Sequence, residues 1–290
     1  MKAGILGQRG AWHVVSLQSA LERRGIRAPC FPVTQMTAQL GTHPWLAVGE
    51  DALEDLDLLF VRGVPGGSLE QVIFRVDALH RLENAGVRLV NTPATIERTV
   101  DKYYTSTLLE DAGIPTPRTV VTENLDQALA AFENLGGDVV IKPLFGSEGR
   151  GMVRVSDADT ARRVLLALEL GRYVYYLQQF VAHDNQDVRV FVVGGQVVSA
   201  MVRHGTSWKT NVAQGATAAP LLPDDLLSDL ALRATRAVGA DYAGVDILAT
   251  QDGYTVIEVN GIPGWRGLQS VTHPSIADYL VQYALRLVPK

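Results

Sequence analysis

The sequence predicts an α/β fold in which a small parallel β-sheet with flanking helices precedes a larger α+β region. Up to about residue 98, apolar segments typical of buried strands alternate with amphipathic segments typical of helices. This alternation implies parallel strands joined by crossover helices. Beyond that point the pattern changes to helices and hairpin-like strand pairs. The 290 residues and the apolar content of 47% are sufficient for two or three subdomains.

Five segments define the first region. Strands are predicted over residues 2–6, 55–63 and 87–91, and helices over residues 12–25 and 68–86. Gly25 is placed to end the first helix, because glycine readily adopts the conformation that follows a helix. Ser68 can cap the second helix, and Gly86 closes it. Together these segments predict a small parallel sheet with helices on both faces.

The second region mixes helices with paired strands. Helices are predicted over residues 101–113, 125–136 and 223–239. A short apolar strand that starts at Val139 leads into a glycine-rich stretch. After Gly171 the sequence predicts two hairpin-like strand pairs, one on each side of the third helix. Helices beside strand pairs are typical of α+β structure.

Composition and charge disfavour several classes of partner. The 26 basic and 31 acidic residues give a net charge of −5, without a basic run that would follow a nucleic acid backbone. Cys30 is the only cysteine, which excludes an internal disulfide and disfavours a cysteine-based zinc site. No segment approaches the ~18 apolar residues of a membrane span, and no signal peptide is recognisable. A reducing, cytoplasmic location without a membrane or nucleic acid partner is expected.

The stretch "VVIKPLFGSEGRGMVRV" places Lys142 at the end of an apolar strand, directly before a glycine-rich loop. Met152 follows Gly151 where a Walker loop requires lysine, so the loop is not a Walker motif. The run "GILGQRG" also lacks the G-x-G-x-x-G spacing of a dinucleotide site. A lysine together with backbone N–H groups suits a lid over a polyphosphate. The alternative is a solvent-exposed glycine hairpin with a surface lysine.

A second chemical signal is the predicted hairpin "AGVDILATQDGYTVIEVNGIPG", with its turn at Asp252-Gly253. If Thr250 faces Tyr254, equal steps along both strands place Asp246 opposite Glu258, with Asn260 on the same face as Glu258. Two carboxylates paired across strands repel each other, and a cation would remove the conflict. Carboxylate and amide oxygens favour Mg²⁺ or Mn²⁺ over zinc. The alternative is a solvent-facing hairpin with incidental acidic residues.

The other predicted hairpin joins "DVRVFVV" to "QVVSAMVRH" at Gly194-Gly195. Asp187 and Arg189 share one face of the first strand by alternation. Uniform pairing places Arg203 on the opposite face of the second strand, unless a bulge intervenes. The alternative interpretation is that these charges are simply the solvated ends of apolar strands.

Taken together, these segments resemble the ATP-grasp superfamily, specifically its RimK-like amino-acid ligases. The resemblance extends from about Asn91 to Pro263, and more loosely over the whole chain. It is carried by five motifs in order: "NTPATIERTVDKYYTSTLLEDAGIPTPRT", "VVIKPLFGSEGRG", "YYLQQFVAHDNQDVRVFVVGGQVVSAMVR", "WKTNVAQGA" and "AGVDIL…IEVNGIPG".

The resemblance implies three domains. Residues 1–97 would form an N-terminal pre-ATP-grasp domain, residues 98–177 a central lobe with the glycine-rich lid, and residues 178–290 a C-terminal lobe with the metal site. It also implies a homodimer or homotetramer.

The resemblance also assigns roles to individual residues. The ATP-binding residues would be Lys102, Lys142, Gly146, Ser147, Glu148, Gly149, Gly151, Gln179, Phe180, Val181 and Asp187. The metal-binding residues would be Asp246, Glu258 and Asn260, the catalytic residues Arg203, Lys209 and Asn211, and the substrate-binding residues Arg62, Arg189, Arg203 and Asn211. One departure is the Gln178-Gln179 pair, where the family usually has Gln-Glu at the adenine hinge.

The function implied is ATP-dependent amide formation through an acyl phosphate, with ATP and Mg²⁺ or Mn²⁺, releasing ADP and phosphate. The chain is most similar to the branch that acts on tetrahydromethanopterin-type coenzymes, adding L-glutamate to a small carboxylate acceptor. The first domain, with Arg9, Trp12, His13 and Arg62, is expected to select that acceptor.

Three alternatives to that function stay open. The first is a RimK-type ligase with a protein or carrier-protein acceptor, or with another amino acid. The second is a non-catalytic homologue that binds nucleotide. The third is an NAD-dependent oxidoreductase that uses the N-terminal region.

Overall fold

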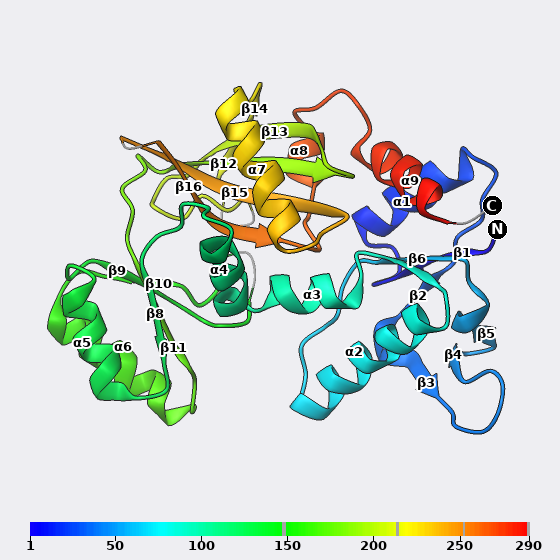
Figure 1. The fold of residues 1–290 in the computed structure, drawn as a ribbon, viewed down its shortest axis with the longest axis horizontal. Coiled ribbons are helices and arrows are strands. Elements are labelled where there is room, and N and C mark those ends of the chain that lie inside the picture. The colour runs from blue at the N-terminus through cyan, green and yellow to red at the C-terminus, as the bar shows by residue number, and fades with distance from the viewer. Residues whose placement is uncertain (147–148, 213–214, 252, 289–290) are drawn as a thin grey trace.

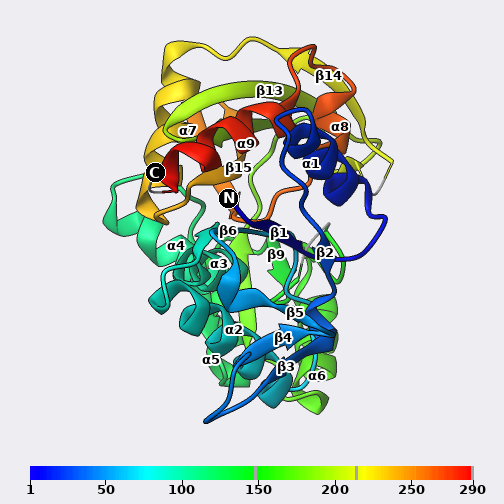
Figure 2. The ribbon, with the colours of Figure 1, turned by 90° about the vertical axis from the view of Figure 1, so that its right-hand side faces the viewer.

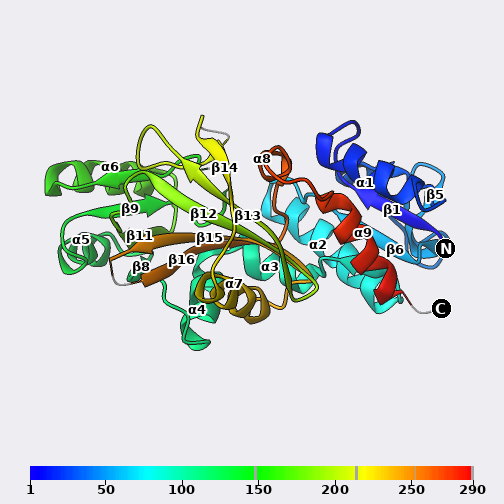
Figure 3. The same ribbon diagram turned by 90° about the horizontal axis from the view of Figure 1, so that it is seen from above.

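The computed structural model describes residues 1–146, 149–212, 215–251 and 253–288. Three larger β-sheets lie in a row along the molecule, with the five-stranded sheet between the other two (Figures 1 and 3). Within the described residues, no helix is both long and apolar enough to cross a membrane.

The first sheet is parallel, as the sequence predicts. Its strands, in spatial order, are β2 (Cys30–Phe31), β1 (Ala3–Leu6), β6 (Leu58–Val61) and β7 (Arg88–Val90). Alternate residues of β6 face opposite sides: Phe60 packs in the cluster that contains α1 (Trp12–Glu22), and Leu59 in the cluster that contains α2 (Leu69–Asn84). This arrangement confirms the prediction of helices on both faces.

Local sequence signals fix the ends of α2. The Ser68 side chain accepts a hydrogen bond from the Gln71 amide, and the Gln71 side chain accepts one from the Ser68 amide, which completes a capping box. Gly86 follows the helix with φ 97°, in the left-handed region that favours glycine.

Short elements between β2 and β6 were not predicted. An antiparallel sheet contains β3 (Met36–Ala38), β4 (Leu46–Val48) and β5 (Asp51–Ala52), and two 3₁₀ turns span Val33–Gln35 and Leu53–Asp55. Figure 2 shows this small sheet at the edge of the N-terminal part.

The second sheet is antiparallel and carries the strand that ends at Lys142. Its order is β10 (Val153–Val155), β9 (Val139–Lys142), β11 (Tyr175–Gln179) and β8 (Thr119–Thr122). Helices α5 (Leu125–Asn134) and α6 (Ala158–Leu170) pack against it in a common apolar cluster. Two helices, α3 (Pro93–Val100) and α4 (Lys102–Asp111), connect it to the first sheet.

The third sheet has five antiparallel strands. Their order is β14 (Thr217–Leu221), β13 (Gln196–His204), β12 (Gln186–Val193), β15 (Tyr242–Thr250) and β16 (Gly253–Asn260). Helix α7 (Asp225–Ala237) packs in one apolar cluster of this sheet. The other cluster contains α8 (Arg266–Gln269), α9 (Ile276–Leu287) and α1, so the C-terminal helix joins the first and third sheets.

Two bulges in the third sheet change the predicted registers. Val192 pairs with Val197 but Phe191 pairs with Ser199, so Val198 is an extra residue. Arg203 therefore lies directly opposite Asp187, and the expectation from uniform pairing that it faces the other side of the sheet is wrong. A one-residue slip moves every later side chain to the other face.

The second bulge lies in the β15–β16 hairpin. Thr250 pairs with Gly253, so the predicted pairing of Thr250 with Tyr254 is wrong by one residue. Ile257 is the extra residue that compensates, because Ile247 pairs with Val256 and Asp246 pairs with Glu258. The predicted juxtaposition of Asp246 and Glu258 is confirmed. Asp252, the first residue of the predicted Asp252-Gly253 turn, lies outside the described residues.

The predicted limits of the three domains stay a prediction. The first sheet lies within residues 1–97, but β11 extends to Gln179, past the predicted limit at residue 177. Helix α9 also returns to pack on α1.

We expect Leu280→Ala to lower the free energy of unfolding by about 2–5 kcal/mol, because it leaves a cavity where α9 meets both sheets. Leu280 is fully buried. Urea unfolding measures the change. Leu222→Ala is the matched control, since Leu222 is 93% exposed and should contribute little. Equal losses for the two variants would contradict this account of α9.

Candidate active site

A cleft between the second and third sheets collects most of the predicted functional residues. Its walls come from α4, β9, β11, β12, β13, β15 and β16, with the glycine-rich loop and the segment around Trp208. The predicted residues that line it are Lys102, Lys142, Gly146, Gly149, Gln179, Phe180, Val181, Asp187, Arg203, Lys209, Asn211, Asp246 and Glu258.

Some predicted residues lie elsewhere. Gly151, Arg189 and Asn260 adjoin the cleft residues in sequence or by contact but are not part of its lining, and Arg62 lies at the junction of the first and third sheets. Ser147 and Glu148 lie outside the described residues.

Two lysines face the cleft from separate elements. Lys142 ends β9, and its Nζ donates to Gln178 Oε1 at 2.6 Å. Burial lowers the pKa of Lys142 to about 8, while the Glu258 carboxylate counteracts part of that shift. Burial likewise lowers the pKa of Lys102, at the start of α4, and Glu258 and Asp101 raise it in part. A bound polyanion would stabilise the charged form of both lysines.

The glycine-rich loop contacts opposite sides of the cleft. Lys102 Nζ donates to the Gly146 carbonyl at 2.8 Å. A Cβ atom at Gly149 would lie 2.4 Å from Asn211 Oδ1, and Gly149 has φ +70°, so only glycine fits without strain. Gly146 thus contacts Lys102 and Gly149 lies against Asn211, and both glycines line the cleft.

The hinge after β11 leaves one amide available. The Gln179 N–H donates to the Arg118 carbonyl at 2.8 Å, and the Phe180 N–H donates to the Asp138 carbonyl at 2.9 Å. Among the described residues, the Val181 N–H has no hydrogen-bond acceptor. Val181 also lines the cleft, so its amide is the hinge donor that a heterocyclic base can use.

A row of charges crosses the floor of the cleft on one face of the third sheet. Arg203 lies opposite Asp187, and Arg189 lies opposite Asp246. Arg189 donates from Nε and Nη2 to the two Asp246 oxygens, each at 2.6 Å. Arg203 makes a bidentate pair with Asp187 and also lies 3.1 Å from Asp246. Glu258 continues the row on β16.

Burial makes the pairing in this row obligatory. Asp187, Arg203 and Asp246 are each 2% exposed or less. Burial alone would raise the pKa of Asp246, but Arg189 and Arg203 outweigh it and lower the pKa. The cation that the sequence required beside Asp246 is thus supplied, in this structure, by two arginines of the protein itself.

The three predicted metal donors differ in availability. Glu258 makes no side-chain hydrogen bond or ion pair with any described residue, although it is partly buried and lines the cleft. Asn260 Nδ2 makes only a long contact of 3.5 Å to the Gly244 carbonyl, which leaves its Oδ1 open. Within the described residues, no three His, Cys, Asp or Glu side chains cluster tightly enough to hold a metal alone. The oxygen-only donor set fits Mg²⁺ or Mn²⁺ shared with a ligand's own oxygens.

Arg62 occupies a structural position. Its Nη1 donates to the Tyr242 hydroxyl at 2.7 Å, its Nη2 donates to the Pro263 carbonyl at 2.8 Å, and its guanidinium lies 4.5 Å from the centre of the Trp265 ring. His13 accepts a hydrogen bond at Nε2 from the Trp265 amide at 2.9 Å. A role of these side chains in acceptor selection stays a prediction.

Sequence reasoning missed several residues that shape the cleft. Gln178 is buried and holds Lys142, while its amide nitrogen donates to Thr119. Tyr176 lies on the same face of β11 and hydrogen-bonds Ser106 of α4. Their period-two spacing in β11 is a signal that sequence alone contains.

Phe180 was predicted as a hinge residue, but the side chains around its ring were not. The Arg154 guanidinium lies 3.4 Å from the centre of the Phe180 ring, and the Trp208 ring meets Phe180 edge-on at 6.4 Å. Phe180 and Trp208 both line the cleft, next to the hinge amide. This group provides an apolar surface for a planar base.

Comparison with known proteins places this site in context. The family model described as "RimK-like ATP-grasp domain" matches residues 99–284. A tetrahydromethanopterin:alpha-L-glutamate ligase of Methanococcus maripaludis is 36% identical over 98% of both chains. An alpha-aminoadipate–LysW ligase LysX of Sulfurisphaera tokodaii is 35% identical over 69% of this chain and 72% of its own.

A solved structure supports the fold. The RimK domain protein ATP-grasp from Sphaerobacter thermophilus superposes with a TM-score of 0.78, covers 98% of this chain and 99% of its own, and is 22% identical. The ATP-grasp architecture expected from the sequence is therefore confirmed.

We expect Arg203→Met to lower the free energy of unfolding by about 3–5 kcal/mol, because it leaves Asp187 and part of Asp246 buried without a cation. Chemical denaturation measures the loss. Arg163→Met is the control, since Arg163 pairs with Asp159 at the surface, where both side chains are at least 70% exposed. An Arg203 variant no less stable than the Arg163 variant would contradict the account of the charged row.

The imidazole of His13 predicts a pH dependence of stability. Burial, followed by Arg62 and Arg266, lowers its pKa from 6.5 to about 4. The unfolded chain therefore binds this proton more readily than the folded one, and stability falls as the pH drops from 6.5 towards 4.

Substituting the histidine should remove this part of the acid sensitivity. We expect His13→Asn to lose less stability than the wild type between pH 6.5 and 4, as measured by urea unfolding at a series of pH values. His204→Asn, at an exposed position, is the control. The same acid-induced loss in wild type and His13→Asn would show that His13 is not responsible.

Proposed function

This chain belongs to the RimK-like ATP-grasp family, and on that premise we propose that it is an ATP-dependent carboxylate–amine ligase. Its proposed reaction adds L-glutamate to a carboxylate of a tetrahydromethanopterin-type coenzyme or a related small molecule, with release of ADP and phosphate. The observation that carries the proposal is a single cleft that combines Lys102 and Lys142, a glycine-rich loop and the Glu258 carboxylate, which pairs with no described residue.

The cleft suits ATP in one orientation. The Val181 amide can donate to the adenine ring, while Phe180 and Trp208 offer apolar surface beside it. Lys142 and Lys102 then face the phosphates, and the loop that contacts Lys102 covers them. Replacing the usual hinge glutamate by Gln179 leaves backbone recognition of adenine unchanged.

The acidic end of the cleft suits divalent metal. Glu258 and the Asn260 amide oxygen are free to coordinate, and Asp246 is adjacent. A bound Mg²⁺ or Mn²⁺ would neutralise charge on the phosphates and orient them for transfer.

The proposed chemistry has two balanced steps. An oxygen of the acceptor carboxylate attacks the γ-phosphorus, the bond to the β-phosphate oxygen breaks, and ADP leaves. The neutral amine of glutamate then attacks the acyl carbon, phosphate leaves, and the nitrogen loses a proton. Arg203, Lys209 and Asn211 line the cleft where the transferring group would lie, so we assign them to charge stabilisation. The loop excludes water from the reactive acyl phosphate.

The acceptor is proposed to bind at the first sheet. The chain adds β2 on one side of β1 and then β6 and β7 on the other, so the order of the parallel strands switches sides between β1 and β6. Ligands of parallel sheets commonly bind at such a switch point, beyond the carboxyl ends of the strands. Arg9 and Arg62 follow β1 and β6 at that edge. Their positive charges suit a carboxylate-bearing acceptor. The LysX relative, which its name describes as joining alpha-aminoadipate and LysW, favours the alternative of another acceptor or another amino acid.

Two further proposals rest on the family resemblance. The limits 1–97, 98–177 and 178–290 remain our division into pre-ATP-grasp domain, central lobe and C-terminal lobe. A homodimer or homotetramer remains the proposed assembly.

The function is tested by product analysis. The protein is incubated with Mg-ATP, each amino acid singly and a pool of carboxylate acceptors that includes pterin coenzymes, and ADP and AMP are measured. We expect ADP only when glutamate and a coenzyme acceptor are both present. Release of AMP would overturn the acyl-phosphate mechanism, and ADP formed with a carrier protein alone would establish the alternative acceptor.

We expect Glu258→Gln to lower turnover at least roughly 100-fold, because it removes a carboxylate that would hold the metal beside the phosphates. The melting temperature should stay near that of the wild type, since Glu258 has no partner among the described residues. Glu133→Gln, an exposed substitution on α5, is the control for turnover. Near-normal turnover of Glu258→Gln would contradict the metal assignment.

A further inference from the structure

The segment that follows the metal-binding strand β16 is held by the N-terminal part of the chain at every second residue. Asn91 Nδ2 donates to the Gly261 carbonyl at 2.6 Å, and Arg62 Nη2 donates to the Pro263 carbonyl at 2.8 Å. The Trp265 amide donates to His13 Nε2 at 2.9 Å. These three contacts join residues that are 170, 201 and 252 positions apart in the sequence.

Asn91 makes the most complete of these contacts. It is fully buried, and besides Gly261 it donates to the Tyr242 carbonyl at 2.8 Å. Its Oδ1 accepts from the amides of Asp241 at 2.7 Å and Tyr242 at 3.2 Å. The carboxamide therefore uses both donors and both acceptor positions, which no other uncharged side chain of similar size can do.

Asn91 lies where the strand pairing of the β15–β16 hairpin, which contains the proposed metal donors, comes to an end. The last paired residues of β15 and β16 are Gly244 and Asn260. Beyond them, the Asn91 side chain bridges the Tyr242 and Gly261 carbonyls and replaces the missing ladder contacts between the two strands. The bridge is adjacent to Asn260, one of the proposed metal donors.

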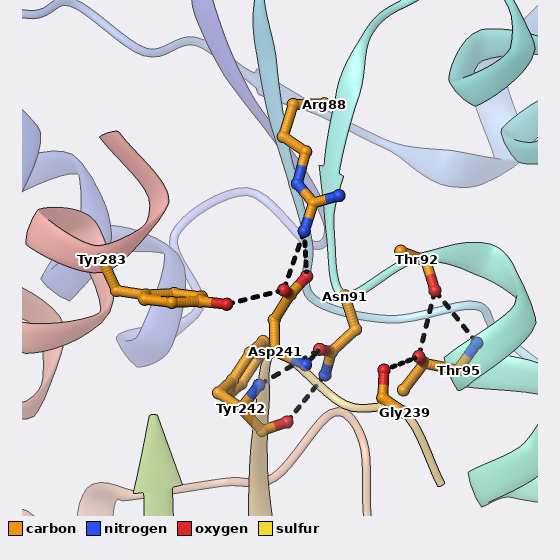
Figure 4. A network of polar contacts seen from close by, with 8 residues as sticks. All are labelled: Arg88, Asn91, Thr92, Thr95, Gly239, Asp241, Tyr242 and Tyr283. Carbon is orange, nitrogen blue, oxygen red and sulfur yellow. Dashed lines mark hydrogen bonds and ion pairs between the residues drawn. The ribbon is translucent and has the colours of Figure 1, made fainter. Parts of the chain in front are cut away.

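Neighbouring polar contacts fix the backbone to which Asn91 binds (Figure 4). Arg88 Nη2 donates to the two Asp241 oxygens at 2.7 and 2.9 Å, and the Tyr283 hydroxyl donates to Asp241 at 2.9 Å. Thr95 Oγ1 donates to the Gly239 carbonyl at 2.7 Å. The turn before β15 is thus held by the first sheet, α3 and α9.

Packing leaves the segment little room to shift. A Cβ atom at Gly261 would lie 2.3 Å from Thr99 Oγ1, and one at Gly244 would lie 3.0 Å from Pro263 Cβ. Close approach on both sides means that the contacts to Asn91, Arg62 and His13 define one backbone position.

We propose that Asn91 is a positioning residue of the ligase, which holds the open end of the β15–β16 hairpin so that Asn260 and Glu258 present their oxygens to metal-bound nucleotide. Arg62 supports the same segment two residues further on. This inference rests on the proposed function, because it concerns the metal site assigned there. It makes the N-terminal domain part of the metal-binding apparatus.

The test compares two isosteric substitutions at the same domain contact. Asn91→Asp keeps the shape and the acceptor oxygen but loses the donors to Gly261 and Tyr242. Thr95→Val removes the hydrogen bonds of Thr95 Oγ1 with Gly239 and Thr92, away from the metal donors. Titration calorimetry measures ADP affinity with EDTA and with Mn²⁺, and thermal unfolding measures stability.

We expect Mn²⁺ to strengthen ADP binding by wild type and by Thr95→Val equally. In Asn91→Asp that strengthening should fall about tenfold or more, the usual effect of losing a residue that orients a metal ligand, while the affinity in EDTA stays unchanged. If Asn91→Asp retains the wild-type Mn²⁺ effect, the proposal is overturned, and Asn91 has only a structural role. If wild type itself shows no Mn²⁺ effect, the metal assignment of the proposed function fails, and the inference fails with it.

A second variant covers the case in which Asn91→Asp does not fold. Arg62→Gln removes the donor to Pro263 while leaving Asn91 in place. We expect a smaller but measurable loss of the Mn²⁺ effect on ADP binding. An unchanged Mn²⁺ effect in folded Arg62→Gln contradicts the proposed support of the segment by the N-terminal domain.

Discussion

The structure depends on one constraint: charges that are buried in the third sheet must be paired within it. Arg203, Asp187, Arg189 and Asp246 pair directly across β13, β12 and β15. An unpaired ion at this depth costs several kcal/mol, whereas a bidentate pair offsets most of that cost. The Arg203–Asp187 pair forms only because the bulge at Val198 moves Arg203 onto the face of Asp187. A local backbone irregularity thus determines the electrostatics of the cleft floor.

Four other charged side chains of the cleft differ from those on its floor in having no ion-pair partner among the described residues. Asp187 and Asp246 are neutralised by the arginines, whereas Lys142, Lys102, Lys209 and Glu258 form no ion pair with any described residue. Burial lowers the pKa of Lys142 to about 8, and its Nζ donates to the neutral Gln178 amide and pairs with no carboxylate of the described residues. Three lysines and one carboxylate that lack ion-pair partners among the described residues are the complement of a metal–polyphosphate. The protein's own pairing therefore defines which charges remain for a ligand.

Sequence reasoning succeeded where the signal is local. Ser68 and Gly86 bound α2, and Gly194 and Gly195, with φ 57° and 74°, form the turn of β12 and β13. Bulges have no comparable signal, since neither Val198 nor Ile257 differs in type from an ordinary strand residue. Asp246 was placed opposite Glu258 because a one-residue error at the turn was cancelled by the bulge at Ile257. For Arg203 no second error compensated, and uniform pairing placed it on the wrong face.

Contacts over long sequence distances were beyond sequence reasoning for a different reason. Asn91 was recognised as part of a motif, but its partners at Tyr242 and Gly261 are set by how α3 and α9 bring the first and third sheets together. Arg62 was expected to face substrate because the family resemblance implied it, yet both of its Nη atoms donate within the protein. Substrate binding by Arg62 is compatible with these internal hydrogen bonds if the acceptor binds at the same edge of the sheet. In the proposed ligase, an acceptor that displaces or tightens Arg62 would act on Pro263, three residues from Asn260. Acceptor selection and metal positioning would then be coupled through the same guanidinium, which gives the N-terminal domain a direct influence on phosphoryl transfer.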